Sequence, residues 1–300
     1  METAVLRWFQ QVADGMTVTE VADLDMVSQP GVSRALARLE KEVGAPLLHR
    51  SGRTLRMTRA GAAFKRHVDA LLHELDDGLA AVDQLVDPST GTVALAFQPS
   101  FGSLLVPDLV RSFHDVRPGV GFELAQVRSE GVVAVLESGA ADLALAGRLT
   151  DAAVTWRRLL TEPLRLAVHE GHPLAGRAGV ALAEAASEPF AALRPASLLR
   201  RQSEELCQRA GFRPRVVLEA DELPTVHGLV AAGLAVAVLP AGLAAGPGPS
   251  SVRLLPLEDP GATREVGLAW SAERRLLPSA QAFADHVLHR AAAGELPVLR

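Results

Sequence analysis

The spacing of apolar residues predicts one long helix, which divides this chain of 300 residues into a short N-terminal part and a longer C-terminal part. Between positions 68 and 86 the apolar residues are separated by 4, 3, 4, 3 and 4 positions, at Val68, Leu72, Leu75, Leu79, Val82 and Val86. This heptad spacing places six side chains along one seam of a helix. We expect the helix over residues 58–87, because residues 88–91 contain a proline and a glycine and form a hinge.

The basic residues are concentrated immediately before this seam. The whole chain has 30 basic and 35 acidic residues, with a formal net charge of −5. Residues 28–66 contain nine basic and two acidic residues, whereas residues 67–87 contain six acidic residues and no Lys or Arg. A concentrated basic block inside an acidic chain is typical of a surface that binds a polyanion. A solvated basic face is the alternative.

The basic block contains the pattern of a winged helix-turn-helix. Apolar spacing predicts three helices before the seam, at about residues 5–15, 17–25 and 28–42. Ser28 suits the N-cap of the third helix, and Pro30 is tolerated in its first turn. Two short helices, a tight turn and a third helix with polar residues at its start are typical of a helix-turn-helix. The apolar and basic residues at 46–58 then predict a short strand and a hairpin, which together form a wing.

Residues 27–61 resemble the DNA-binding segment of the LysR-type transcriptional regulators. The matching residues are Ser28-Gln29-Pro30, Ser33-Arg34, Leu39-Glu40, Gly44, Pro46-Leu47, Arg50, Gly52-Arg53, Thr58 and Ala60-Gly61. Gly31 departs from the pattern, because the family commonly has Ala there, and Leu48-His49 stands where the family often has Phe-Glu. The resemblance implies that residues 1–60 form a winged helix-turn-helix domain that binds double-stranded DNA.

Nine residues of this segment are the expected DNA contacts: Ser28, Gln29, Pro30, Ser33, Arg34, Arg38, Arg50, Arg53 and Arg56. Gln29, Ser33 and Arg34 lie on the outward face of the third helix, where Gln can pair with adenine and Arg with guanine in the major groove. The other arginines suit phosphate contacts, and Arg53 in the wing also suits the minor groove. For each arginine the alternative is an exposed salt bridge within the protein.

The seam predicts that two copies of the chain pair through the long helix. A helix that packs on its own domain would show the same stripe, but a two-fold dimer fits the reading of two half-sites. The resemblance likewise implies a dimerising linker helix over residues 58–87. We therefore expect a homodimer or homotetramer on an interrupted palindrome, with RNA polymerase as a candidate partner.

After the hinge, predicted strands alternate with predicted helices, which is typical of parallel α/β sheets. One series runs from residue 92 and a second begins at residue 164, so we expect two subdomains with a cleft between them. Residues 142–147, 162–175, 210–240 and 266–270 resemble the effector-binding domain of the same family, whose fold is similar to periplasmic binding proteins. The resemblance implies an effector-binding domain over residues 92–300. Subdomain I would then comprise residues 92–161 and 267–300, and subdomain II residues 162–266.

The cleft residues are expected at strand ends and helix starts. The candidates are Gln98, Pro99, Ser100, Phe101, Gly102, Ser129, Glu130, Gly147 and Arg148 from subdomain I, and Arg194, Pro195, Ala196, Asp221 and Thr225 from subdomain II. Ser100 and free N–H groups suit a carboxylate or another anion, and Arg148 or Arg194 would pair with it. Glu222, next to Asp221, is a further candidate. All of these could instead be ordinary loop residues, and Asp221 with Glu222 could cap the next helix. We expect a small-molecule effector, with an anion as one candidate, and no other cofactor.

Other functional classes are weaker interpretations. The sequence has no Walker loop, GxSxG or GxGxxG motif, and His169 with His172 lacks an obvious third metal ligand, so we expect neither an enzyme nor a metal site. The single cysteine, Cys207, is expected to be a buried apolar residue. We expect a cytoplasmic location without a membrane span. The alternative function is a small-molecule-binding protein or enzyme of the periplasmic-binding-protein fold with a non-functional DNA head.

Overall fold

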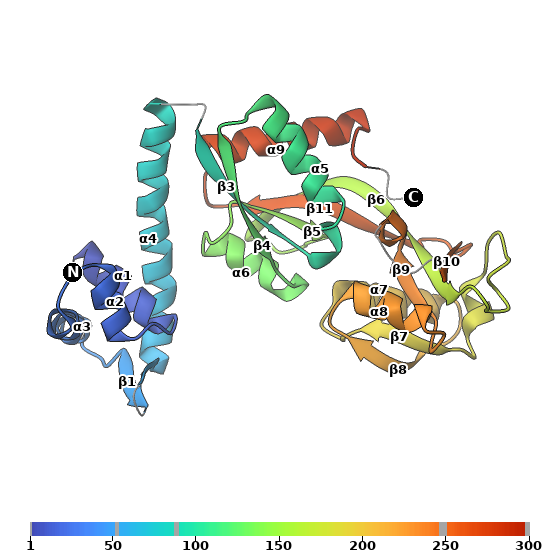
Figure 1. The fold of residues 1–300 in the computed structure, drawn as a ribbon, viewed down its shortest axis with the longest axis horizontal. Helices are drawn as coiled ribbons and strands as arrows, with labels where there is room; N and C mark the ends of the chain where they lie inside the picture. Colours follow the sequence, from blue (N-terminus) through green and yellow to red (C-terminus); the bar gives the residue numbers. More distant parts are fainter. Residues whose placement is uncertain (1, 52–53, 87–89, 246–250, 298–300) are drawn as a thin grey trace. The chain divides into compact units, whose positions relative to one another are not determined.

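The computed structural model describes residues 2–51, 54–86, 90–245 and 251–297 (Figure 1). Residues up to position 83 form one compact unit, and most of the residues from position 84 onward form a second. The first unit, called the head below, contains α1 (Thr3–Ala13), α2 (Val18–Leu24), α3 (Gln29–Val43), β1 (Leu48–Ser51), β2 (Thr54–Met57) and α4 (Arg59–Val86). These elements match the predicted order of three helices, a wing and a long helix.

Local hydrogen bonds explain where the helices of the head begin. At the start of α2, Thr17 accepts a hydrogen bond from the backbone N–H of Glu20, whose carboxylate accepts one from the N–H of Thr17. This capping box satisfies two N–H groups that a helix otherwise leaves free. At the start of α3, the Ser28 hydroxyl accepts from the N–H of Gly31, as the sequence predicted. Gly44 ends α3 in the left-handed conformation that glycine adopts at little cost.

The wing is joined closely to the start of α4. Strands β1 and β2 pair antiparallel with Leu48 opposite Met57, so the strand predicted at 46–48 begins only at Leu48. A Cβ atom on Gly61 of α4 would lie 2.0 Å from the carbonyl oxygen of Leu47, a distance that no side chain tolerates. The glycine therefore allows α4 to pass directly against the wing.

The first half of α4 is part of the head's own core, which corrects the predicted dimer seam. Val68 and Leu72 are 3% and 1% exposed and pack with Phe9 of α1 in one apolar cluster. Ion pairs support the same contact, because Lys65 of α4 lies 3.0 Å from Asp14 and the Arg7 guanidinium binds Asp76 and lowers the pKa of that carboxyl. Val68 and Leu72 are thus unavailable to a second copy, because α1 already covers that face.

Another face of α4, from Leu71 to Val82, carries an apolar stripe that its own unit leaves exposed. Leu71, Leu75, Leu79 and Val82 are each between 41% and 59% exposed. Leu75, Leu79 and Val82 belong to the predicted seam. Leu71 does not, but it is exposed at the point of the stripe where the prediction placed Leu72, which is buried. The side chain of Val86, the last predicted seam residue, lies outside the described part of the chain.

Met26, in the turn between α2 and α3, has a φ of 53° and is 92% exposed. An L-residue in this left-handed region costs about 1–2 kcal/mol, and Asn tolerates it better than Met because its short polar side chain can hydrogen-bond locally. Met26→Asn is therefore expected to raise the unfolding free energy by about 0.5–1 kcal/mol. Urea unfolding would measure the change. The control is Val27→Asn, at a residue whose φ is negative; if both variants stabilise the chain equally, the backbone is not the cause.

Subdomain I of the second unit is an α/β sheet with helices on both faces. Its elements are β3 (Gly91–Phe97), η1 (Pro99–Phe101), α5 (Leu105–Val116), β4 (Val120–Gln126), η2 (Ser129–Gly131), α6 (Val132–Glu137), β5 (Leu143–Gly147) and α9 (Pro278–Ala293). Phe113 of α5 packs edge-to-face on Phe283 of α9, and both helices bury one face of the sheet. Helix α6 covers the other face with Val132 and Leu136 (Figure 1).

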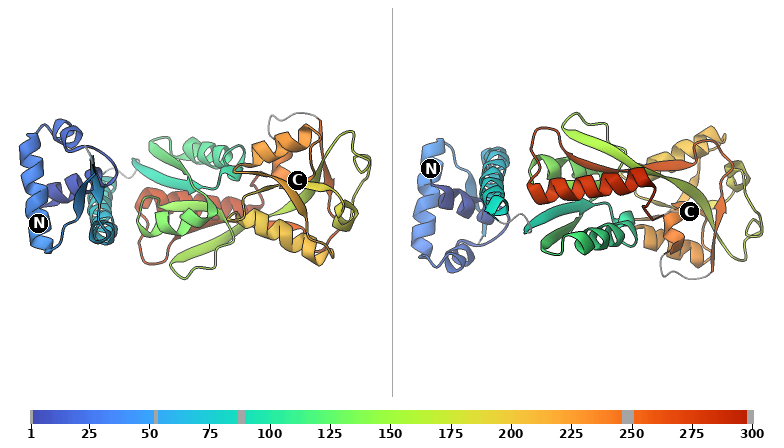
Figure 2. Two further views of the ribbon diagram at one scale, coloured as in Figure 1. Left: turned by 90° about the horizontal axis from the view of Figure 1, so that it is seen from below. Right: turned by 90° about the horizontal axis from the view of Figure 1, so that it is seen from above.

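Two long strands, β6 (Val154–His169) and β11 (Thr263–Ser271), connect the two subdomains (Figure 2). They pair antiparallel, and β11 also pairs antiparallel with β5. The expectation of purely parallel sheets is therefore wrong. Among the named strands of the described residues, the parallel pairs are β3 with β4, β3 with β5, and β7 with β8. The long strands are antiparallel because the chain leaves subdomain I along β6 and returns along β11 in the opposite direction.

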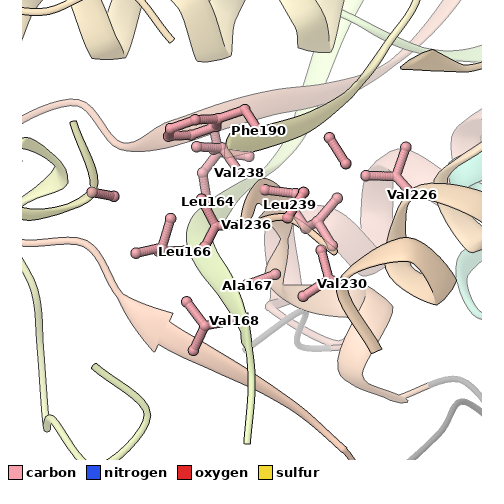
Figure 3. Close-up of a cluster of buried hydrophobic side chains, with 14 of the residues drawn as sticks. Leu164, Leu166, Ala167, Val168, Phe190, Val226, Val230, Val236, Val238 and Leu239 are labelled. Atoms are coloured by element: carbon pink, nitrogen blue, oxygen red, sulfur yellow. The ribbon is translucent and has the colours of Figure 1, made fainter. Parts of the chain in front are cut away.

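Subdomain II is built around the C-terminal half of β6. Its elements are η3 (Leu182–Ala185), β7 (Pro189–Leu193), α7 (Leu198–Arg209), β8 (Arg215–Ala220), α8 (Leu223–Ala231), β9 (Ala237–Pro240), η4 (Ala241–Ala245) and β10 (Val252–Pro256). Figure 3 shows its core, in which Leu166 of β6, Phe190 of β7 and Val230 of α8 meet. The sequence did not predict β7, β10 or the first ten residues of β6. Paired arginines and Pro163 obscure the strand pattern in that part of β6.

Candidate functional sites

The N-terminal end of α3 presents polar side chains on the surface of the head. Arg34 is exposed, and within the described residues no acidic group lies within ion-pair distance of its guanidinium. The Gln29 amide donates a hydrogen bond to the Ser33 hydroxyl at 3.0 Å, which fixes the orientation of both side chains on one face. Ser28 is the N-cap of α3 and Pro30 lies in its first turn. Both residues therefore have a structural role at the start of α3 besides the predicted DNA contact.

The other predicted DNA-contacting arginines differ in their surroundings. Arg38 lies 3.2 Å from Glu2 and 3.9 Å from Glu42, so it makes the intramolecular salt bridges considered above as the alternative. Arg56 is exposed on β2, opposite His49. The side chain of Arg50 and the whole of Arg53 lie outside the described residues.

A cleft of about 170 Å³ lies between subdomains I and II. Nine of the fourteen predicted effector residues line it: Gln98, Pro99, Ser100, Ser129, Glu130, Gly147, Arg194, Ala196 and Asp221. Gln98 organises the wall on the subdomain I side, because its amide donates to the Ser129 hydroxyl at 2.9 Å and accepts from the N–H of Gly147 at 3.2 Å. The ends of β3 and β5 and the start of η2 are thereby linked.

Five predicted residues do not line the cleft: Phe101, Gly102, Arg148, Pro195 and Thr225. The prediction for Phe101 is wrong, because its ring packs into the core of subdomain I and is 1% exposed. Gly102 lies behind the ring of Phe97, and Arg148 is held by Glu265 at 3.2 Å. Pro195 and Thr225 are exposed outside the cleft.

Several lining residues were missed in the sequence: Arg128, Leu193, Ser197, Leu198, Leu199, Gln202, Leu223, Pro224, Arg264 and Glu265. Glu222, a further candidate for which helix capping was the alternative, also lines the cleft. Leucines and prolines form most of the apolar surface. Arg264 and Glu265 were missed because the strand was expected to begin at residue 267, whereas β11 begins at Thr263. A strand predicted to begin at residue 263 would have placed both residues beside the cleft.

An ion pair joins the two subdomains at the mouth of the cleft. The Arg128 guanidinium of subdomain I lies 3.3 Å from Asp221 of subdomain II, which also accepts a hydrogen bond from Arg194 at 2.9 Å. Neither Asp221 nor Glu222 caps α8, since Glu222 stands at the N-cap without a side-chain hydrogen bond. The capping alternative is therefore wrong. All three charged groups of this bridge are exposed, so it contributes little to stability.

A second ion pair lies on the inner side of the cleft and is buried. Arg264 of β11 donates to Glu162 of β6 at 2.6 Å, with side chains 7% and 1% exposed. Burial lowers the pKa of the Arg264 guanidinium, and the neighbouring Glu162 carboxylate opposes that shift. The guanidinium stays charged, because arginine keeps its proton in proteins even where it is buried.

The remaining reactive groups do not point to catalysis. The His172 imidazole lies 3.6 Å from Glu188, and the described residues contain no cluster of three or more His, Cys, Asp or Glu that could hold a metal ion. Burial raises the pKa of the Cys207 thiol to about 12, with contributions from nearby acidic groups. That thiol is therefore protonated near neutral pH and fits the buried apolar role predicted for it. Within the described residues, no helix is long and apolar enough to cross a bilayer.

A winged helix-turn-helix, a linker helix and a cleft between two α/β subdomains define a DNA-binding regulator that responds to a small molecule. The model of the bacterial regulatory helix-turn-helix proteins of the lysR family matches residues 4–62, and the model of the LysR substrate binding domain matches residues 87–292. The chain belongs to the LysR family of transcriptional regulators. This is a family of DNA-binding regulators and not of enzymes, which removes the alternative of an enzyme with a non-functional head.

The similarity to curated relatives extends over nearly the full length of the chain. The chain is 35% identical to the HTH-type transcriptional regulator YybE of Bacillus subtilis (strain 168), covering 96% of this chain and 98% of YybE. It is 33% identical to the transcriptional dual regulator GltC of the same organism, covering 96% and 97% of the two chains. Among solved structures, CbnR, a LysR family transcriptional regulator, matches with a TM-score of 0.76 and 22% identity over 97% of this chain and 99% of CbnR. The structure of CbnR with its target DNA gives the same TM-score.

Proposed function

We propose that paired copies of this chain bind an interrupted palindrome near a promoter, and that a small organic anion in the cleft alters how the heads contact it. The single observation that carries this proposal is the cleft itself. It lies between two subdomains that share the strands β6 and β11, so a ligand that touches both walls favours one separation of the walls over another.

The exposed stripe on α4 supports pairing of two copies. Four large apolar side chains remain 41–59% exposed on one helix, so covering the exposed part of each contributes about half of the roughly 1.5–3 kcal/mol that full burial provides. A second α4 with the same stripe buries both stripes, and the resulting two-fold symmetry matches two half-sites. Such a pair, or a tetramer built from two pairs, is the assembly we propose.

The chemistry of the cleft supports a small ligand with an anionic group. Its volume of about 170 Å³ is below the roughly 300–1,000 Å³ of sites for drug-sized ligands. Ser100 and Arg264 supply hydrogen-bond donors on the inner side, and Leu193, Leu198 and Leu223 supply apolar contact. A compact organic acid combines the two properties.

A regulator of this kind acts where DNA is transcribed, so we place it in the cytoplasm, with RNA polymerase as the partner whose access it changes. We propose no cofactor other than the effector.

The test is DNase footprinting of the full chain on the DNA upstream of its own gene, with and without a panel of small metabolites. We expect two protected half-sites, and at least one metabolite that changes the protected pattern and raises the melting temperature. Protection of a single half-site at all protein concentrations would contradict the paired assembly. A metabolite that stabilises the protein without changing the footprint would contradict the coupling of cleft and heads.

A further inference from the structure

Ionic contacts join α1 to α4 at both ends of the stretch that these two helices share. Arg7 of α1 binds the Asp76 carboxylate of α4 with both terminal guanidinium nitrogens, and Nη1 donates to Oδ2 at 3.0 Å. At the other end, Nζ of Lys65 lies 3.0 Å from Asp14, at the C-cap of α1, and 2.7 Å from Asp69 of α4. These two sets of contacts, Arg7–Asp76 and Lys65–Asp14–Asp69, are called the α1–α4 clamp below.

Between the two ends of the clamp, the helices meet through apolar side chains. Phe9 of α1 packs with Val68 and Leu72 of α4 in the core of the head. Asp69 and Asp76 lie on either side of Leu72, about 10 Å apart along α4 at a rise of about 1.5 Å per residue. An apolar contact is non-directional and by itself tolerates a change of crossing angle, whereas a bidentate pair of arginine and carboxylate has a defined geometry. The clamp therefore holds the angle at which α1 crosses α4.

This angle affects DNA binding because α3 belongs to the same core as α1. Val32 and Leu36 of α3 pack in the cluster that contains Phe9, so α3 keeps its position relative to α1. In the paired assembly proposed above, the two copies meet through α4. The separation of the two α3 helices, and their rotation about the DNA axis, then depend on how each α1 crosses its α4.

The spacing of two half-sites places strict demands on this geometry. With about 10–10.5 base pairs in a turn of about 34–36 Å, one added base pair moves a half-site by about 3.4 Å along the duplex and by about 35° around it. A head that is fixed on its linker helix cannot follow this displacement, whereas a head that rotates on α4 can.

We propose that the α1–α4 clamp determines which half-site spacing the paired chain accepts, by fixing the angle of each head on its linker helix. This inference rests on the proposed function and adds specificity-determining residues that lie outside the recognition helix α3. The Arg7–Asp76 pair is partly exposed and contributes little to stability, so removing it alters the position of the head much more than its folding.

Binding of the full chain to operators of different spacing tests the clamp. The segment between the half-sites is lengthened or shortened by one and by two base pairs, and fluorescence anisotropy measures the affinity for each duplex. Because a rigid assembly has to twist or bend the DNA instead, we expect the wild type to lose about tenfold in affinity or more for each base pair away from its best spacing. Arg7→Asp, which places two carboxylates together, should reduce that loss to about threefold or less, since the head then follows the half-site.

Two further variants separate positioning from a general loss of charge. Arg7→Asp/Asp76→Arg exchanges the two residues and restores an ion pair of reversed polarity, so it should restore the spacing preference of the wild type. Arg66→Met is the control, because Arg66 is an exposed arginine of α4 for which the described residues supply no acidic partner. It should change the affinity by one factor at every spacing and leave the preference unchanged.

An Arg7→Asp preference as sharp as that of the wild type, or an exchanged pair that fails to restore it, would overturn the inference. Hydrogen exchange of the α1 amides shows whether Arg7→Asp is folded; if it is not, Arg7→Met, which removes the charge and keeps an apolar stem, replaces it in the same series. A wild-type chain that protects two half-sites but binds every spacing equally contradicts this inference and leaves the proposed function standing. A wild-type chain that protects no pair of half-sites contradicts the proposed function, and the inference fails with it.

Discussion

Leu72→Ala is expected to destabilise the head by about 2–5 kcal/mol, the usual cost of truncating a fully buried leucine. Leu72 is 1% exposed and packs between α4 and α1, so the truncated side chain leaves a cavity that the two helices cannot easily close. Hydrogen exchange of the α1 amides in the full chain measures this loss, because it reports on the head separately.

The matched variant is Leu79→Ala, on the same helix but 59% exposed. Its α1 amides should keep their protection, within about 0.5 kcal/mol. Sedimentation at a series of protein concentrations should instead show weaker self-association, because this side chain belongs to the exposed stripe. If Leu79→Ala reduces the protection of α1 as strongly as Leu72→Ala does, the division of α4 into a core half and a pairing half is wrong.

Arg34→Ala is expected to weaken binding to the operator by about 10–100-fold, since one bidentate contact to a base is worth about 1–3 kcal/mol. Arg34 is exposed near the N-terminus of α3, the end that enters the major groove in helix-turn-helix proteins. Fluorescence anisotropy with operator DNA and with a scrambled duplex, at two salt concentrations, separates base contact from phosphate contact. The loss should be much smaller on the scrambled duplex.

Arg38→Ala is the control for this measurement. Arg38 already pairs with Glu2 and Glu42, and it lies further along α3. These exposed ion pairs are weak, so the guanidinium exchanges them for a phosphate when DNA binds. Its loss should therefore weaken binding to both duplexes by similar factors and reduce the salt slope by about one. Equal losses on operator and scrambled DNA for Arg34→Ala would contradict a role in base recognition.

The sequence predicted the head well because its signals are local. Ser28 caps α3, Thr17 caps α2 and Gly44 ends α3 through interactions within four residues of each site. The heptad spacing of the long helix is also local, and it identified the helix correctly. It did not show what covers each part of the stripe, because Val68 and Leu75 follow the same spacing but only Val68 meets α1.

In the effector-binding domain, strand ends predicted nine of the cleft residues, because parallel pairing places the ends of β3, β4 and β5 at one edge in subdomain I and the ends of β7 and β8 at one edge in subdomain II. The antiparallel return of β11 had no such signal. Arg264 lies 164 positions from Ser100 in the sequence, and the pairing of β11 with β5, which in turn pairs with β3, brings them together.

By itself, the sequence determined the order of elements in the winged head, the basic block of residues 28–66 and the family, because helix caps, apolar periods and motif spacing act over a few residues. Only the tertiary structure decided which half of α4 is free for pairing and which charged groups face the cleft. Both depend on contacts between segments distant along the chain, where α1 buries Val68 and Leu72 and where Glu162 fixes Arg264 at the crossing of β6 and β11.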